Sequence, residues 1–310
     1  MRAVFARIAG VAAAPGTVRG MGWMLLSAFM VAIFNGIVRH LSADVHPFEI
    51  AFLHSAFGVL YLTPVYVRSG LAPLKTRRFA MHSVRAALNV TASLFMLTAL
   101  SISPLAEVAA LSFSAPLFAA VLAVALLGER MRARRIGALV VGFAGTWLVF
   151  RPGLEAISPG SLLVLGFAVA WGGAMVAIKA LSRTESSLTQ TLYLGLLNTP
   201  IAAVAAIPVW QTPSLDQLAW LAALGAVGVV RQLSLSQAFK EADATAILPL
   251  DFTKLIWVAI IGYAAFAEIP TMWTWAGGFV IFVATTTITV HEGRLSRTKS
   301  DEGSGSRPGR

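Results

Sequence analysis

The segment from Pro104 to Leu127 reads PLAEVAALSFSAPLFAAVLAVALL and carries one charged side chain, Glu107. At a rise of about 1.5 Å per residue, a helix of this length crosses a hydrocarbon core roughly 30 Å thick. Continuous apolar runs of this length are typical of helices that lie in lipid. The segment therefore predicts a membrane-spanning helix.

The same pattern recurs along the whole chain. Its 310 residues are 57% hydrophobic and only 12% charged, with a mean hydropathy of +0.76, whereas soluble domains have about a quarter charged residues. These values exclude a soluble globule and predict an all-α integral membrane protein. Apolar runs bounded by charges or turn residues predict ten transmembrane helices, near residues 20–39, 47–67, 79–101, 104–127, 135–150, 160–181, 189–210, 215–239, 243–267 and 270–290.

Basic residues are concentrated on one side of these helices. Nineteen of the 24 Lys and Arg residues lie in the terminal segments and in every second connection, and two, Arg39 and Arg151, lie on the opposite side. The other three, Arg85, Arg231 and Lys254, fall within predicted spans. The positive-inside rule then predicts that both termini are cytoplasmic in a multi-pass protein of the cell inner membrane. This distribution explains the net charge of +10 without nucleic acid as a partner.

Two stretches of the chain match by spacing. Ala99 is followed after 30 residues by Glu129, and Ala238 is followed at the same distance by Glu268. A pair of small residues begins eight residues after each glutamate. Such internal repetition is common in transporters that arose by duplication.

The repeat divides the chain into two halves of five helices, residues 20–150 and 151–291. Because five is odd, the second half must enter the membrane in the opposite orientation, which predicts two inverted five-helix repeats. Residues 1–19 form a cytoplasmic N-terminal segment in this scheme. Residues 292–310 have no apolar content to bury and are expected to be a disordered cytoplasmic tail.

The stretch Ala99–Gly142, with Pro116, Leu127-Gly128-Glu129 and Gly137-Ala138, resembles the signature of the EamA-type transporters of the drug/metabolite transporter superfamily. The resemblance covers residues 20–290, with a weaker second copy at Ala238–Gly278. It implies a ten-helix secondary transporter.

The second copy departs from the family pattern in the predicted ninth helix, where Leu250-Asp251-Phe252-Thr253-Lys254 replaces the usual proline. Members similar in this region include carriers of riboflavin, S-adenosylmethionine and opine-type metallophores, whereas the wider family exports amino acids and drugs. The resemblance therefore implies a small-molecule substrate and favours export.

Four charged residues stand out because they lie deep within predicted helices, away from the helix ends: Arg85, Arg231, Asp251 and Lys254. A charge at mid-membrane costs about 2.5 to 3.5 kcal/mol on insertion scales, so such residues mark candidate sites. Their depths from the cytoplasmic ends, roughly 10 to 18 Å, predict one layer. Asn89 continues the polar face of Arg85, and Trp257 continues that of Lys254.

Two interpretations of this layer stay open. In the first, Asp251 neutralises Arg231 or Lys254 and the charges only lock helices together. In the second, the excess of positive charge binds the carboxylate of a substrate, because arginine presents a planar fork that matches carboxylate.

Other polar residues also have two interpretations. His54 could couple protons or be an ordinary hydrogen-bonded histidine. Glu107 could be an outer gate or proton site, or an acid favoured at a helix N-terminus. Glu129 and Glu268 end predicted helices and are expected to cap or lock turns rather than to bind substrate.

The favoured function is a secondary transporter that works by alternating access and exports a carboxylate-bearing compound, resembling an amino acid or an opine metallophore. The alternative is an importer of riboflavin or a compound like S-adenosylmethionine. An intramembrane enzyme is disfavoured because the sequence has no Gly-x-Ser-x-Gly or His-Glu-x-x-His motif and no paired intramembrane aspartates. No cofactor or metal is expected. The lipid bilayer is a partner, and a homodimer is left open.

Overall fold

The computed structural model describes residues 16–69, 75–127, 133–150, 158–181, 184–185, 187–241, 250–251, 253–284 and 286–287. Most of the predicted N-terminal segment 1–19, the tail 292–310 and Glu129 lie outside these ranges. The described part contains helices and no strand. The first helix begins at Gly16, a turn before the position that the sequence predicts.

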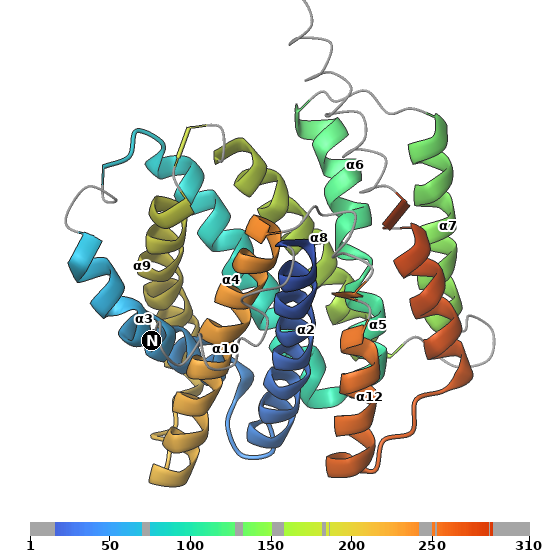
Figure 1. The fold of residues 1–310 in the computed structure, drawn as a ribbon. Coiled ribbons are helices and arrows are strands. Elements are labelled where there is room, and N and C mark those ends of the chain that lie inside the picture. The colour runs from blue at the N-terminus through green and yellow to red at the C-terminus, as the bar shows by residue number, and fades with distance from the viewer. Residues whose placement is uncertain are drawn as a thin grey trace, which may run out of the picture.

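The first half contains α2 (Gly16–Leu41), α3 (Pro47–Ser69), α4 (Phe79–Ile102), α5 (Leu105–Ser112), α6 (Ala115–Leu127) and α7 (Ala133–Phe150) (Figure 1). The second half contains α8 (Pro159–Leu181), α9 (Ser187–Ala206) with the short η3 (Ile207–Val209), α10 (Leu215–Glu241), α12 (Thr253–Phe266) and an apolar helix at Met272–Ala284.

Seven of these helical stretches are long and apolar enough to cross a membrane, and three shorter apolar helices lie at Ile136–Val149, Thr253–Phe266 and Met272–Ala284. The protein is therefore an all-helical membrane protein. A topology of exactly ten crossings, with both termini in the cytoplasm, stays a prediction.

The predicted helix 104–127 is divided in two. α5 ends at Ser112 and α6 begins at Ala115, with Phe113 and Ser114 between them. Pro116 has no N–H group and cannot complete the helical hydrogen bond to residue 112, which favours a break here. The carbonyl of Leu111 accepts from both the N–H of Ser114 at 2.9 Å and its hydroxyl at 2.7 Å, so it stays partnered at the break.

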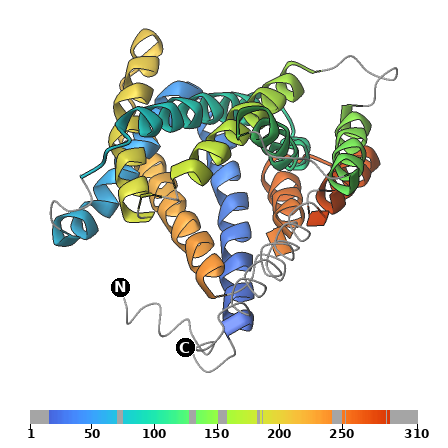
Figure 2. The ribbon, with the colours of Figure 1, turned by 90° about the horizontal axis from the view of Figure 1, so that it is seen from above.

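Helices of the first half pack between helices of the second half, and the reverse. α2 lies between α10 and α12, and α8 packs along α4 and α6 (Figure 2). α3 contacts α10, and α4 contacts α9. α2 ends near the C-terminus of α4, where Arg39 meets Leu100 and Ser101, while α8 begins at the same end, with Gly160 against Ser103. The first helices of the two halves therefore run in opposite directions.

Glycines bring the fifth predicted helix, α7, against Met272–Ala284. A Cβ atom on Gly277 would lie 2.7 Å from the carbonyl oxygen of Gly145 and would also overlap Val149. A Cβ on Gly145 would lie 2.9 Å from the backbone nitrogen of Ile281. Such close backbone approach is how membrane helices gain packing energy without a hydrophobic driving force.

We expect Gly277→Ala to lower the free energy of unfolding by about 1 to 3 kcal/mol, because the added methyl group meets backbone that cannot move aside. Thermal melting of the purified protein in detergent measures the change. Gly137→Ala on α7 is the matched control, since nothing lies within 4 Å of its Cβ position. An equal loss in both variants would contradict the packing explanation.

Candidate functional site

Arg85 and Asn89 lie on the face of α4 that meets α9. The Arg85 side chain is buried, and its Nη1 donates to the backbone carbonyl and to Oε1 of Gln190, both at 3.2 Å. Asn198 donates from Nδ2 to Oδ1 of Asn89 at 2.5 Å. The polar face of α4 is therefore covered by a second polar face, on α9, and does not point toward lipid.

Arg231 lies on α10 in a different environment. Its guanidinium carbon is 5.3 Å from the centre of the Phe34 ring on α2, and its Nε atom is buried with no hydrogen-bond partner among the described residues. The backbone carbonyl of Arg231 accepts a hydrogen bond from Ser27 at 3.3 Å. Arginine over an aromatic face is stabilised by cation–π attraction, and Nε stays available as a donor to another acceptor.

His54 on α3 is part of the same cluster. Its ring lies edge to face against Phe34 with centroids 5.4 Å apart, and its Nδ1 is 3.0 Å from the carbonyl oxygen of Ala51. Gly228 of α10 lies beside both rings, since a Cβ there would be in van der Waals contact with Phe34 and His54. His54 and Arg231 thus lie against the same ring, Phe34, a proximity that the sequence did not indicate.

Asp251 and Lys254 pair with each other. Lys254 Nζ is 2.7 Å from Asp251 Oδ2, and it lies 4.0 Å from the centre of the Phe113 ring at the break between α5 and α6. Within the described residues no carboxylate lies within 4.0 Å of the Arg85 or Arg231 guanidinium. The predicted layer therefore contains one neutral pair and two arginines without a carboxylate partner.

Trp257 lies apart from this pair. Its side chain is 38% exposed, and its ring meets Phe29 of α2 edge to face with centroids 5.2 Å apart. Arg85 and Asn89 are likewise held at the α4–α9 contact, while Arg231 faces Phe34. The structure thus distributes the predicted site residues over neighbouring interfaces rather than gathering them all in one contact cluster.

Glu107 lies at the opposite end of the bundle from the start of α2. Its Oε1 accepts a hydrogen bond from the Ser161 hydroxyl at the start of α8. Both residues line a cavity of about 100 Å³, together with Glu268, Thr271 and Thr274. Because Glu107 is in the first turn of α5, its carboxylate also has the helix-terminal location that favours an acid.

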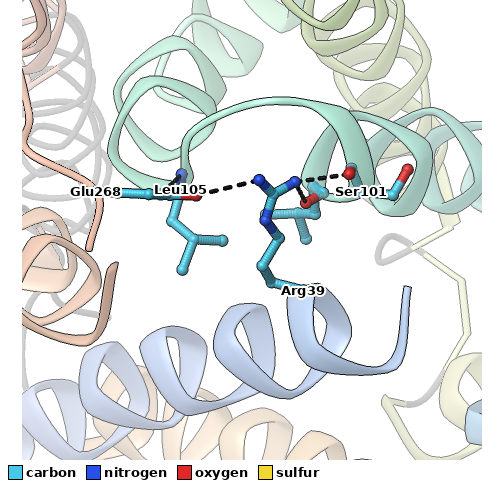
Figure 3. A network of polar contacts seen from close by, with 5 residues as sticks. Arg39, Ser101, Leu105 and Glu268 are labelled. Carbon is cyan, nitrogen blue, oxygen red and sulfur yellow. Dashed lines mark hydrogen bonds and ion pairs between the residues drawn. The ribbon is translucent and has the colours of Figure 1, made fainter. Parts of the chain in front are cut away.

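Glu268 caps a helix, as the sequence predicts. Its Oε2 accepts a hydrogen bond from the backbone nitrogen of Leu105, the first residue of α5, at 2.7 Å (Figure 3). Its other oxygen is 3.3 Å from Nη2 of Arg39. Arg39 was not predicted as a contact residue, although a lone cation at the end of an apolar helix was a usable signal.

Gln190 is a second contact residue that was not predicted from the sequence. It stands three positions before Tyr193, whose ring stacks on His82 at a centroid distance of 4.6 Å. Polar residues at helical spacing on 189–210 could have revealed a face complementary to that of α4.

These features define a polytopic helical protein with cationic side chains inside the bundle, as expected of a membrane carrier. The model of the EamA-like transporter family matches the chain twice, at residues 18–151 and 158–290. The chain belongs to the EamA-like transporter family. It is thus a multi-pass inner-membrane transporter of the drug/metabolite transporter superfamily and not an enzyme.

Curated relatives match over nearly their whole length. An S-adenosylmethionine uptake transporter of Rickettsia bellii is 31% identical over 90% of this chain and 96% of its own. A riboflavin transporter of Vibrio cholerae is 30% identical over 90% and 95%, and a pseudopaline exporter of Pseudomonas aeruginosa is 28% identical over 89% and 95%. One solved crystal structure, 19% identical, shares the fold with a TM-score of 0.59 over 90% of this chain and 98% of its own.

The pair of Asp251 and Lys254 can be tested by a double-mutant cycle. We expect Asp251→Asn and Lys254→Gln each to lower the free energy of unfolding by about 1 to 3 kcal/mol, because each leaves a partly buried charge unpaired. The double variant should lose less than the sum of the two. Melting temperatures in detergent measure the coupling.

The cycle for Arg19 and Glu241 is the matched control. These side chains are 2.9 Å apart, but Arg19 is 38% exposed, so their coupling should stay below about 1 kcal/mol. Additive losses for Asp251 and Lys254 would show that their contact contributes nothing to stability.

Proposed function

We propose that the protein is a secondary transporter that moves a small carboxylate-bearing metabolite across the inner membrane by alternating access. The observation that carries this proposal is Arg231. Its guanidinium lies against an aromatic ring, its Nε has no acceptor among the described residues, and the neighbouring Asp251 is already paired with Lys254. An arginine with a buried, unpartnered Nε is best satisfied by an anionic group of the substrate.

The other predicted residues take supporting roles in this proposal. No opposite charge cancels that of Arg85 among the described residues, because its partner Gln190 is neutral, and Asn89 extends the same polar face. The pair of Asp251 and Lys254 can open to offer an ammonium group to the substrate. Trp257 offers an aromatic surface beside α2.

Alternating access requires two comparable halves around a central path, and we propose two inverted repeats with the boundaries 20–150 and 151–291. Three pairs of contacts support this symmetry. The contact of α2 with α10 corresponds to that of α8 with α4, and α2 with α12 corresponds to α8 with α6. The contact of α3 with α10 likewise corresponds to that of α9 with α4. The double match of the family model and the antiparallel course of α2 and α8 also support it.

The direction of transport and the identity of the substrate are finer proposals. Export is the prediction from sequence, and the pseudopaline exporter is a relative named for that direction. Uptake of a compound like S-adenosylmethionine is the second candidate, supported by the relative from Rickettsia bellii. S-adenosylmethionine has a carboxylate, so Arg231 can serve either candidate. Proton coupling by His54 or Glu107 stays a prediction.

We expect Arg231→Gln to reduce transport at least tenfold while the melting temperature stays within about 2 °C, because removing an excess cation leaves no carboxylate newly unpaired. Labelled S-adenosylmethionine and riboflavin are followed in right-side-out and inverted vesicles, which also gives the direction. Decarboxylated S-adenosylmethionine is the matched competitor: it should compete more weakly than the parent compound if a carboxylate is recognised.

Arg19→Gln makes the same chemical change at the pair with Glu241, outside the charged layer, and should transport normally. A parallel loss of stability and transport in Arg231→Gln would mean that Arg231 only holds helices together. Equal competition by the decarboxylated compound would refute carboxylate recognition.

The proposed topology can be tested directly because the chain has no cysteine. Asp44, in the turn after α2, and Lys75, before α4, are both exposed. We expect Asp44→Cys to react with a membrane-impermeant maleimide on intact spheroplasts, and Lys75→Cys to react only after permeabilisation. The reverse pattern would place the termini outside.

A further inference from the structure

A polar junction joins four helices at the end of the bundle opposite the start of α2. Arg39, in the last turn of α2, donates from Nη1 to the backbone carbonyls of Leu100 at 3.1 Å and Ser101 at 2.6 Å (Figure 3). Its Nη2 is 3.3 Å from Glu268, just beyond α12. Glu268 in turn accepts from the backbone nitrogen of Leu105. We call these two side chains, Arg39 and Glu268, the lock.

Each charge of the lock lies at a helix end where the helix dipole has the opposite sign and therefore stabilises it. Arg39 binds carbonyls at the C-terminus of α4, where the helix dipole is negative. Glu268 binds the first backbone nitrogen of α5, where the dipole is positive. Their side chains are only 26% and 15% exposed, so water competes weakly for these contacts.

The chain approaches Glu268 through an unusual backbone conformation. Ala267 has φ = 54°, the left-handed region that favours glycine, and its N–H donates to the carbonyl of Tyr263 at 3.1 Å. This left-handed turn ends α12 and directs the next residue, Glu268, back across the bundle to α5. The position of the carboxylate is therefore fixed by the end of α12, so movement of α12 must move the lock.

The lock also connects the two halves of the chain. Arg39, Leu100 and Leu105 belong to the first matched range, residues 18–151, and Glu268 belongs to the second, 158–290. Glu268 lies 14 residues beyond Lys254, about 20 Å along the helix direction. The lock is thus separated from the charged layer and lies toward the face of the membrane that the proposed topology makes external.

We infer that Arg39 and Glu268 form the external gate of the transporter, which is closed in this structure and opens when their ion pair separates. This inference rests on the proposed alternating-access function. When the pair separates, α2 and α12 would move away from the junction of α4 and α5. The polar contacts of Arg39 and Glu268 at this junction can form again when the gate closes. Glu268 also lines the cavity beside Glu107, so the lock borders a space that can widen when the ion pair separates.

A single cysteine below the lock reports whether the gate is open. Ala32 lies two helical turns before Arg39 on the same face of α2 and is fully buried. Ala32→Cys provides the only thiol in the chain, and an impermeant maleimide is applied to intact spheroplasts. In the parent background we expect slow labelling. With Glu268→Gln we expect labelling at least tenfold faster, because the neutral amide loses the ion pair.

Arg39→Gln is the second variant that removes the ion pair. It should accelerate labelling of Ala32→Cys in the same way, while the hydrogen bond between Glu268 and Leu105 is kept. Glu49→Gln is the matched control: Glu49 is another buried acid at this end, and it accepts a hydrogen bond from the backbone nitrogen of Gln211, but it is not paired with Arg39. Its labelling rate should not change. Asp44→Cys sets the rate for a fully accessible thiol on the same side.

Each outcome decides the inference. Unchanged labelling in both lock variants would show that the contacts are only structural, and equal acceleration in Glu49→Gln would show general loosening of the bundle. Absence of labelling at Asp44→Cys from outside would place the lock on the cytoplasmic side and overturn an external gate. Labelling needs no substrate, so its result is independent of whether Arg231 binds a carboxylate.

Discussion

The need to satisfy backbone hydrogen bonds in a hydrocarbon environment controls this structure. Water is absent there, so each N–H and carbonyl must find a partner within the protein, and helices achieve this along their length. Their ends do not, because the first nitrogens and last carbonyls have no partner within the helix. Glu268 and Arg39 supply those partners at the start of α5 and the end of α4. The end of α4 and the start of α5 are therefore satisfied within the protein, and the same ion pair connects the two halves of the chain.

The same requirement explains why the fourth predicted helix can be divided. Serine hydroxyls on either side of Phe113 donate to carbonyls of α5, so the break leaves fewer unsatisfied groups than the loss of helix alone would cause. The Phe113 ring at the break lies under the ammonium group of Lys254. A local backbone irregularity thus becomes a place where a cation is held inside the membrane, and carriers commonly use such irregular segments around their substrate paths.

Charges inside the bundle divide into those that are cancelled and those that are not. Asp251 and Lys254 cancel each other, whereas Arg85 has a neutral partner and Arg231 has an aromatic one. Maintaining a cation in low dielectric without a carboxylate costs stability, and a purely structural contact could be made more cheaply by apolar residues. The arrangement is understandable if an anionic substrate completes it for part of the transport cycle.

The sequence by itself determined the membrane class, the family, the set of intramembrane charges and the bounds of most described helices to within about a turn, because hydropathy and spacing are local properties of the chain. Only the tertiary structure decided the partners of those charges. Helical periodicity shows that Arg85 and Asn89 share a face, but not that the face meets Gln190 on α9. Helical periodicity also allows Asp251 to pair with either Arg231 or Lys254, and it shows no partner for Arg39. In lipid, hydropathy does not select which helices meet. Close backbone approach at glycines such as Gly145 and Gly277 selects which helices meet. Whether two backbones can approach depends on the shape of the folded chain.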